Sequence, residues 1–235
     1  MPRVSVVVVT WNGRALLERF LPSVLASDYP DLEVVVADNA SADGTAEWLA
    51  RAHPGVVVVR HPENWLFARG NNAAVPDATG GVLCFLNNDV EVPPGWLRPL
   101  VAALAEPGVV AGCFETTFDR DGAFGPVGRA FMRLWEARLW MRWHRFAFGD
   151  RALFVRRDVF EAVGGFPDQP IFEDLDLVRA VRRRGRFAFL DAAVVTSARR
   201  YRRGGAVRQQ LRNLALWAAW NAGVAPGRLK RFYPD

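Results

Sequence analysis

Short apolar runs alternate with segments of helical periodicity through the first half of the chain. The apolar runs cover residues 4–10, 33–37, 56–60 and 81–86, and the segments with helical character cover 13–26, 43–52 and 94–105. This alternation is typical of a parallel sheet wrapped by helices. The runs are continuously apolar, so we expect helices on both faces of the sheet. Ligands of such sheets bind at the carboxyl ends of the strands.

The pattern changes near Cys113, where the alternation ends and aromatic and arginine residues become more frequent. A segment at 127–148 looks helical and carries Trp135, Trp140 and Trp143. Its charges lie on opposite faces, which favours a bend or two buried faces over one amphipathic stripe. No linker separates the two halves. We therefore expect one α/β domain with a subdomain fused into its second half.

Polar side chains follow three of the predicted strands. Residues 10–13 follow the first strand, residues 87–89 follow the run at 81–86, and the second strand leads into Asp38, Asn39 and Ser41. Turns and helix caps account for each group taken alone. Parallel strands, however, deliver all three groups to one rim of the sheet, and this convergence favours a binding site there.

Composition narrows the class of protein. A chain of 235 residues without low-complexity segments suffices for one buried α/β core. No apolar run approaches the roughly 20 residues of a membrane helix, and no signal-peptide pattern opens the chain, so we expect a cytoplasmic protein. Cys84 and Cys113 stand in apolar runs, which fits buried thiols in a reducing compartment. The net charge of +5 suits an anionic partner, namely a diphosphate, a phospholipid surface or a nucleic acid.

Asp89 is the candidate metal ligand. It closes an Asn-Asn-Asp triplet after a buried strand, where a carboxylate can hold Mg²⁺ or Mn²⁺ while diphosphate oxygens take the open positions. With one carboxylate in the triplet, the protein would supply only part of the coordination shell. The alternative is a turn leading into a strand at 90–92.

Glu173 and Asp174 are the candidate acids for proton transfer. They open a helical stretch after a loop that contains Gly164 and Gly165. A base aimed into a cleft fits this placement, although acids at a helix amino terminus are also common for dipole reasons alone.

A basic turn at residues 199–205 follows later in the chain. Its arginines could clamp a diphosphate or a phosphorylated acceptor. A solvated surface loop explains them equally.

Five segments together resemble the family 2 glycosyltransferases with the GT-A fold. They are VSVVVVTWNG, VVADNASADGT, ENWLFARGNNAA, FLNNDVEVPPGWL at the family's DxD motif and GGFPDQPIFEDLDL at its catalytic ED motif. The second half further resembles the subgroup named for genomic association with radical-SAM proteins. The resemblance implies a Rossmann-like, mostly parallel central sheet flanked by helices. It divides the chain into a nucleotide-sugar-binding half at 1–113, a fused acceptor and catalytic half at 114–205, and a C-terminal helical segment at 206–235.

The same resemblance implies roles for individual residues. The nucleoside would be held by Thr10, Trp11, Asn12 and Asp38. Arg69 would approach the phosphates, and Asn88 and Asp89 occupy the last two positions of the DxD motif, with Asp89 binding Mn²⁺ or Mg²⁺. Asp174 falls on the general base. The acceptor side would be lined by Glu173, Asp150, Arg199, Arg200 and Tyr201. Asn87 and Asn88 replace acids that many members carry, which weakens the expectation of tight metal binding.

The implied activity is an inverting transfer from a UDP-, dTDP- or GDP-linked sugar to an acceptor that the sequence does not identify, lipid-linked or a cell-surface polysaccharide precursor. A nucleotidyltransferase is disfavoured because TWNGR stands where those enzymes carry a glycine-rich, arginine-containing loop. A catalytically silent nucleotide-sugar-binding or peripheral membrane protein is the second alternative. Peripheral membrane contact would involve the tryptophan-rich segment and residues 207–220. Arginine and tryptophan content alone suggests nucleic acid, and without a recognised motif we expect no such partner.

Overall fold

The apolar runs of the first half form parallel strands, as the pattern predicts. We describe the protein from a computed structural model that covers residues 1–119, 151–199 and 205–233. Strand β1 (Val4–Thr10) pairs in parallel with β2 (Leu32–Asp38) and with β4 (Val82–Asn87), and β2 pairs in parallel with β3 (Val57–Arg60). The helical segment expected at 127–148 lies outside the described residues, as do Asp150, Arg200 and Tyr201.

Further strands join the same sheet. β5 (Val90–Glu91) lies within the strand at 90–92 that was the alternative interpretation of the Asn-Asn-Asp segment. The sequence pattern did not predict β6 (Val109–Phe118), β7 (Leu153–Arg156) or β8 (Arg186–Thr196). The strand order among the described residues is β3-β2-β1-β4-β7-β6-β8-β5. β7 runs antiparallel to both of its neighbours, and β6 runs parallel to β8. β6 passes through residue 113, where the division between the two halves was expected.

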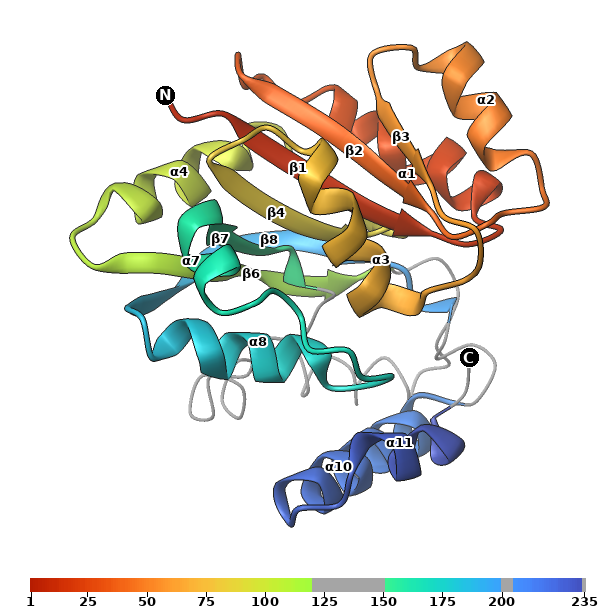
Figure 1. The fold of residues 1–235 in the computed structure, drawn as a ribbon, viewed down its shortest axis with the longest axis vertical. Coiled ribbons are helices and arrows are strands. Elements are labelled where there is room, and N and C mark those ends of the chain that lie inside the picture. The colour runs from red at the N-terminus through yellow and green to blue at the C-terminus, as the bar shows by residue number, and fades with distance from the viewer. Residues whose placement is uncertain (120–150, 200–204, 234–235) are drawn as a thin grey trace.

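Helices cover both faces of this sheet (Figure 1). On one face, α1 (Arg14–Leu25), α2 (Thr45–Ala52) and α4 (Leu97–Ala105) contribute to one hydrophobic core. On the other, a second core includes side chains of α3 (Leu66–Ala74), α7 (Arg157–Ala162) and α8 (Glu173–Arg182). Cys84 lies in the first core and Cys113 in the second, and they form no disulfide.

The C-terminal segment forms a separate helical unit beneath α8. It comprises α10 (Ala206–Asn221), α11 (Pro226–Leu229) and the 3₁₀ turn η3 (Lys230–Phe232); another 3₁₀ turn, η1 (Val75–Asp77), follows α3. Leu216 and Trp220 of α10 form a small third core with Ile171 and Leu175. Within the described ranges, no helix has the length and apolar character needed to cross a bilayer.

The strand order explains where a ligand belongs. After β1 the chain moves outward to β2 and β3, and it then returns to place β4 on the other side of β1. Such a reversal opens a crevice between the two strands at their carboxyl ends, which is where open α/β sheets bind ligands. Residues that follow β1 and β4 are therefore the natural components of the site.

Candidate active site

The three polar groups predicted from the sequence do meet at one rim. Register pairs Thr10 with Asp38 across β1 and β2, and Val9 with Asn87 across β1 and β4, so the three strands end at the same level. Thr10 and Asp38 are almost fully buried. The Asn88 amide nitrogen donates a hydrogen bond of 2.9 Å to the Thr10 hydroxyl, which closes the crevice between β1 and β4 at its floor.

Gly13 permits this close approach. A Cβ at Gly13 would lie 2.1 Å from Thr10 Oγ1 and 2.4 Å from Asn88 Nδ2, both far inside contact distance. The turn between β1 and α1 therefore needs a residue without a side chain at this position. The TWNG sequence ends on glycine because the strand ends of β1 and β4 fill the space that a Cβ would need.

The loop after β1 is held against the loop after β2. The Asn12 backbone N–H donates to Ser41 Oγ at 2.8 Å, and the Ala42 N–H donates back to Asn12 Oδ1 at 2.7 Å. Ser41 N–H donates to the Asp38 carboxylate at 3.2 Å. Between these contacts the ring of Trp11 projects outward with 54% of its surface exposed. The loop after β1 therefore presents a large exposed aromatic ring, whereas the carboxylate that ends β2 is buried.

Asn39 and His61 form a hydrogen-bonded pair next to this loop. Asn39 was among the polar residues expected at the rim, whereas His61 was not. Asn39 Nδ2 donates to the Leu66 carbonyl at 3.0 Å, and His61 Nδ1 lies 2.8 Å from Asn39 Oδ1. Burial lowers the pKa of the His61 imidazole, which is therefore neutral in the folded protein. Asn39 stands in the DNAS segment, so a polar residue directly after the strand was the available signal.

Arg69 lies on α3, at the same end of the molecule but engaged with other side chains. Its guanidinium sits 4.1 Å above the Trp65 ring and 3.5 Å from the Glu63 carboxylate. The Trp65 ring in turn stacks on His61, with centroids 4.5 Å apart. About half of the Arg69 side chain is exposed, so a phosphate contact would require it to leave or extend from this stack.

Asp89 is buried beside the basic turn that follows β8. Register places Val90 opposite Thr196, and Ser197 N–H donates to the Asp89 carbonyl at 3.1 Å. Arg199 Nε then lies 3.0 Å from Asp89 Oδ2. The structure thus joins the predicted metal ligand and the first residue of the predicted basic turn, which lie 110 positions apart in the sequence.

A second buried acid, Asp119, lies next to this pair and was not predicted. Its Oδ1 accepts the Ala198 N–H at 2.8 Å, and its Oδ2 lies 3.4 Å from Arg19 on α1. Nearby, Arg151 is 3% exposed and pairs with Glu115 at 3.0 Å. Asp119 directly follows β6, a strand that the sequence pattern did not predict. A search for polar residues after predicted strands could therefore not find it.

The helix that carries the predicted base is tethered to α3. Asn72 of α3 accepts the Phe166 N–H at 2.9 Å and donates to the Phe166 carbonyl at 2.7 Å. Gly165 has a φ of +73°, and a Cβ there would lie 2.6 Å from Asn72 Oδ1. This loop leads into α8, whose first two residues are Glu173 and Asp174. The start of α8 lies at the same side of the molecule as the carboxyl ends of β1 and β2 (Figure 1).

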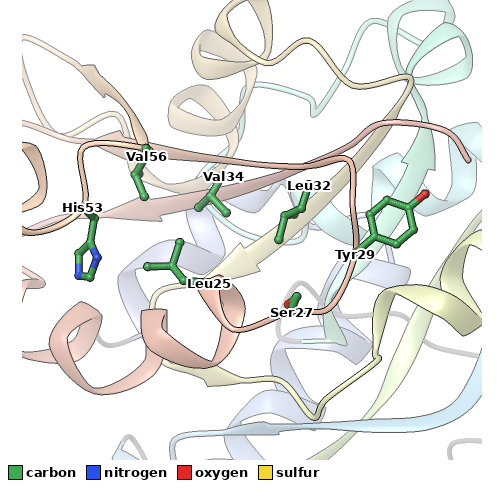
Figure 2. Close-up of a pocket in the computed structure, with 8 residues that line it drawn as sticks. Leu25, Ser27, Tyr29, Leu32, Val34, His53 and Val56 are labelled. Carbon is green, nitrogen blue, oxygen red and sulfur yellow. The ribbon is translucent and has the colours of Figure 1, made fainter.

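A groove of about 370 Å³ lies at the other end of the sheet. It is lined by the end of α1, the start of β2 and the loop before β3 (Figure 2). Its walls combine apolar side chains, including Leu25 and Leu32, with polar groups such as Ser27, and His53 lies at one end. Because these are the amino ends of the strands, the groove is remote from the rim and has no part in the site described above.

The Asn-Asn-Asp triplet offers a divalent metal one carboxylate, that of Asp89. Asp89 provides hard oxygen donors of the kind that Mg²⁺ and Mn²⁺ prefer, and its neighbour Asn88 is turned toward Thr10. Among the described residues there is no cluster of three or more His, Cys, Asp or Glu side chains arranged to hold a metal. The donor set fits a metal that takes most of its shell from a bound diphosphate and water.

Known proteins share this architecture. Residues 5–165 match the family model described as Glycosyl transferase family 2. Glycosyltransferase AglE of Haloferax volcanii is 30% identical over 179 residues, which cover 73% of this chain and 58% of that protein. A Campylobacter jejuni protein named GalNAc(5)-diNAcBac-PP-undecaprenol beta-1,3-glucosyltransferase is 30% identical over 43% of this chain and 34% of its own. The chain thus spans well under two thirds of the length of either relative.

A solved structure extends the likeness to the whole chain. The mannosyltransferase PcManGT from Pyrobaculum calidifontis, in complex with GDP-Man and Mn²⁺, is 27% identical with a TM-score of 0.69. The match covers 98% of this chain and 68% of that one.

Proposed function

The chain belongs to glycosyltransferase family 2 and has the GT-A fold, and from that premise we propose that it transfers a sugar from a nucleotide-diphosphate donor to an acceptor hydroxyl. One observation carries the proposal: the polar residues after β1, β2 and β4 meet at the strand reversal, with Asp89 buried beside them. A nucleotide-binding crevice and a metal-binding carboxylate are the two parts that such a donor requires.

The nucleoside is assigned to the loops after β1 and β2. The exposed ring of Trp11 can stack on a base, and the buried Asp38 carboxylate can accept a hydrogen bond from one. Thr10 and Asn12 hold the adjacent backbone in place. Thr10 accepts a hydrogen bond from Asn88, and the Asn12 N–H donates one to Ser41. Arg69 is assigned to the phosphates, which it would reach by exchanging its contact with Glu63 for a phosphate oxygen.

The diphosphate is assigned to Asn88 and Asp89. A divalent metal bound by Asp89 would neutralise the charge that develops on the leaving nucleotide. Asn88 joins the ends of β1 and β4 through its hydrogen bond to Thr10. Asp89 would determine where the divalent metal binds. Stabilising the leaving group is the larger share of catalysis in such a transfer.

The acceptor is activated from the α8 side. Asp174 removes the proton of the acceptor hydroxyl, the oxygen forms a bond to the anomeric carbon, and the bond from that carbon to the diphosphate oxygen breaks, with inversion. Glu173 and the basic turn line the acceptor side together with Asp150, Arg200 and Tyr201. The tether between Asn72 and Phe166 supports this assignment because it ties the loop before α8 to the helix that carries Arg69.

The acceptor class follows from the relatives as a proposal only. The name of the C. jejuni protein describes a glucosyltransferase that acts on an undecaprenol-diphosphate-linked glycan. We propose a lipid-linked or polysaccharide-precursor acceptor for this chain, and a UDP-, dTDP- or GDP-linked donor. The likeness of the second half to the radical-SAM-associated subgroup stays a prediction and names no substrate.

Peripheral membrane contact is a further proposal. It is supported by Val207 and Leu211, which are one helical turn apart on α10 and 41% and 61% exposed. Arg208 is exposed between them. Apolar side chains flanked by arginine suit an anionic lipid surface.

A thermal-shift panel tests the donor assignment. UDP, GDP, dTDP, CDP and their sugars are added with and without Mn²⁺ to wild type, to Asp89→Ala and to the control Asp158→Ala. Asp158 is an exposed acid on α7 that pairs with Arg156. We expect one nucleotide to stabilise wild type and the control in the presence of Mn²⁺, and Asp89→Ala to lose that shift.

Three other outcomes would change the assignment. Absence of a shift with every nucleotide would refute the donor site and favour the membrane-binding alternative. A shift that Asp89→Ala retains would refute the role of Asp89. A Mn²⁺-dependent shift without release of the nucleoside diphosphate in extracts that contain the acceptor would favour the silent nucleotide-sugar-binding alternative.

A further inference from the structure

We propose that Arg199 is a displaceable counter-ion of Asp89, which a divalent metal must replace and which then moves onto the diphosphate. The inference rests on the proposed function and goes beyond it, because it makes metal binding and movement of the Arg199 side chain two parts of one event. It concerns only Asp89, directly before β5, and the described residues that follow β8.

The backbone directs Arg199 at Asp89. Ser197 N–H is bound to the Asp89 carbonyl at 3.1 Å and Ala198 N–H to the Asp119 carboxylate at 2.8 Å. These two successive hydrogen bonds fix the chain directly before Arg199 between two acids. The backbone that carries Arg199 is therefore held in place, and Arg199 Nε lies 3.0 Å from Asp89 Oδ2.

Burial explains why Asp89 holds a cation. Its side chain is only 9% exposed, and a carboxylate removed from water is strongly unfavourable without an opposite charge or hydrogen bonds. Arg199 supplies such a charge at 3.0 Å. A metal that binds Asp89 must therefore compete with this contact.

Exposure explains why Arg199 can leave. Its side chain is 44% exposed, so the guanidinium can swing into solvent without a large desolvation cost of its own. A divalent ion and a guanidinium on one carboxylate repel each other, because like charges within a few ångströms disfavour one another. Metal entry therefore releases Arg199, and a diphosphate provides the bidentate oxygen acceptors that a guanidinium prefers.

The proposal predicts effects of opposite sign on two ligands. Without nucleotide, Arg199→Ala should bind Mn²⁺ more tightly than wild type, by about tenfold, a coupling within the usual range between linked sites. With inorganic pyrophosphate added to saturating Mn²⁺, the same variant should bind the pyrophosphate more weakly than wild type. A purely structural arginine would weaken both when removed.

The experiment measures free Mn²⁺ by electron paramagnetic resonance and pyrophosphate by titration calorimetry. The variants are Arg199→Ala, Arg199→Gln, which keeps a polar side chain of similar length if the alanine variant unfolds, and Asp89→Asn. The matched control is Arg186→Ala, because Arg186 is also an exposed arginine on an acid, 3.2 Å from Glu106. We expect the control to match wild type and Asp89→Asn to lose Mn²⁺ binding.

Equal or weaker Mn²⁺ binding by both Arg199 variants would overturn the proposal, as would failure of every variant to bind Mn²⁺. Both results leave the donor assignment to the nucleotide panel, which does not depend on Arg199. Conversely, Arg199→Ala could bind Mn²⁺ more tightly while wild type shows no thermal shift with any nucleotide. That result would support Arg199 as the counter-ion of Asp89 and refute the proposed transferase activity.

Discussion

His61 shows how a side chain outside every recognised motif shapes the rim. Its Nδ1 meets the Asn39 oxygen at 2.8 Å, and its ring stacks on Trp65. Because the Asn39 amide nitrogen donates to Leu66, the Asn39 oxygen is the acceptor and His61 Nδ1 carries the proton. Its Nε2 finds no hydrogen-bond partner among the described residues, so a second proton there would be buried without an acceptor.

Folding stability should therefore depend on His61 at mildly acidic pH. Burial lowers the pKa of this imidazole in the folded state, so its contribution is fully present above the unfolded pKa, about 6.5. It is lost as the pH falls below that value toward the folded pKa, because the unfolded chain then binds the proton first. Urea unfolding at several pH values between neutrality and pH 5 should show a smaller loss for His61→Gln than for wild type. Parallel curves would contradict the assignment.

Asp174 is the residue with the largest expected effect on turnover. If it deprotonates the acceptor, Asp174→Asn should lower kcat by about 10² to 10⁴ and leave the donor KM nearly unchanged. Asp176 provides a matched control, because it lies two residues further along α8 and is bound to Gln169 and Arg179. Release of the nucleoside diphosphate measures both variants. A comparable loss in Asp176→Asn would indicate damage to α8 instead of loss of a base.

At the scale of elements, the strands could be predicted where apolar runs and helical segments alternate regularly. β1, β2, β3 and β4 were found within one or two residues, because buried parallel strands are continuous apolar runs. β6 and β8 were missed because their pairing has two register shifts and their sequences mix glycine, alanine and acids with apolar residues. β7 was missed because it has only four residues, the last of which is an arginine.

The same contrast holds for the site. Thr10, Asp38, Asn88 and Asp89 stand directly after predicted strands, so the rim followed from the sequence. The Asp89–Arg199 contact did not, because it depends on the pairing of β5 with β8. Asp119 and the Asn72 tether likewise depend on contacts between segments about 80 to 95 residues apart.

The turn between β1 and α1 should be intolerant of any side chain. Gly13→Ala would force the Thr10 hydroxyl and the Asn88 amide apart, and overpacking of this kind costs about 1–3 kcal/mol. Gly55→Ala is the control, because no atom lies within 4 Å of a Cβ there. Denaturant midpoints should fall for Gly13→Ala only, together with the nucleotide-induced thermal shift. An unchanged midpoint would show that the crevice floor can open without cost.

At the scale of the whole molecule, the C-terminal unit uses some side chains of α10 to pack against α8 and leaves others exposed. Trp220 stacks on Phe172 with centroids 5.0 Å apart and lies under the Arg179 guanidinium at 3.7 Å. Its ring is therefore used in attaching α10 to α8. Val207 and Leu211, on the same helix, face solvent, and these two side chains are left to meet another surface.

Flotation with liposomes tests that surface. We expect the protein to float with vesicles that contain anionic phospholipid, and the double variant Val207→Asp, Leu211→Asp to remain at the bottom of the gradient. Leu25→Asp is the control, because Leu25 is an exposed apolar residue at the remote groove. No flotation of wild type would refute membrane contact and leave the transferase proposal intact.

The direction of β7 brings its first residues to the same rim at which β6 ends. β6 ends at the rim, where Asp119 is anchored by Ala198, and β7 begins near the same rim, where Arg151 is anchored by Glu115. Both strand ends are therefore held by side-chain contacts of a carboxylate. This edge of the sheet is fixed at two points in addition to the backbone pairing between β6 and β7.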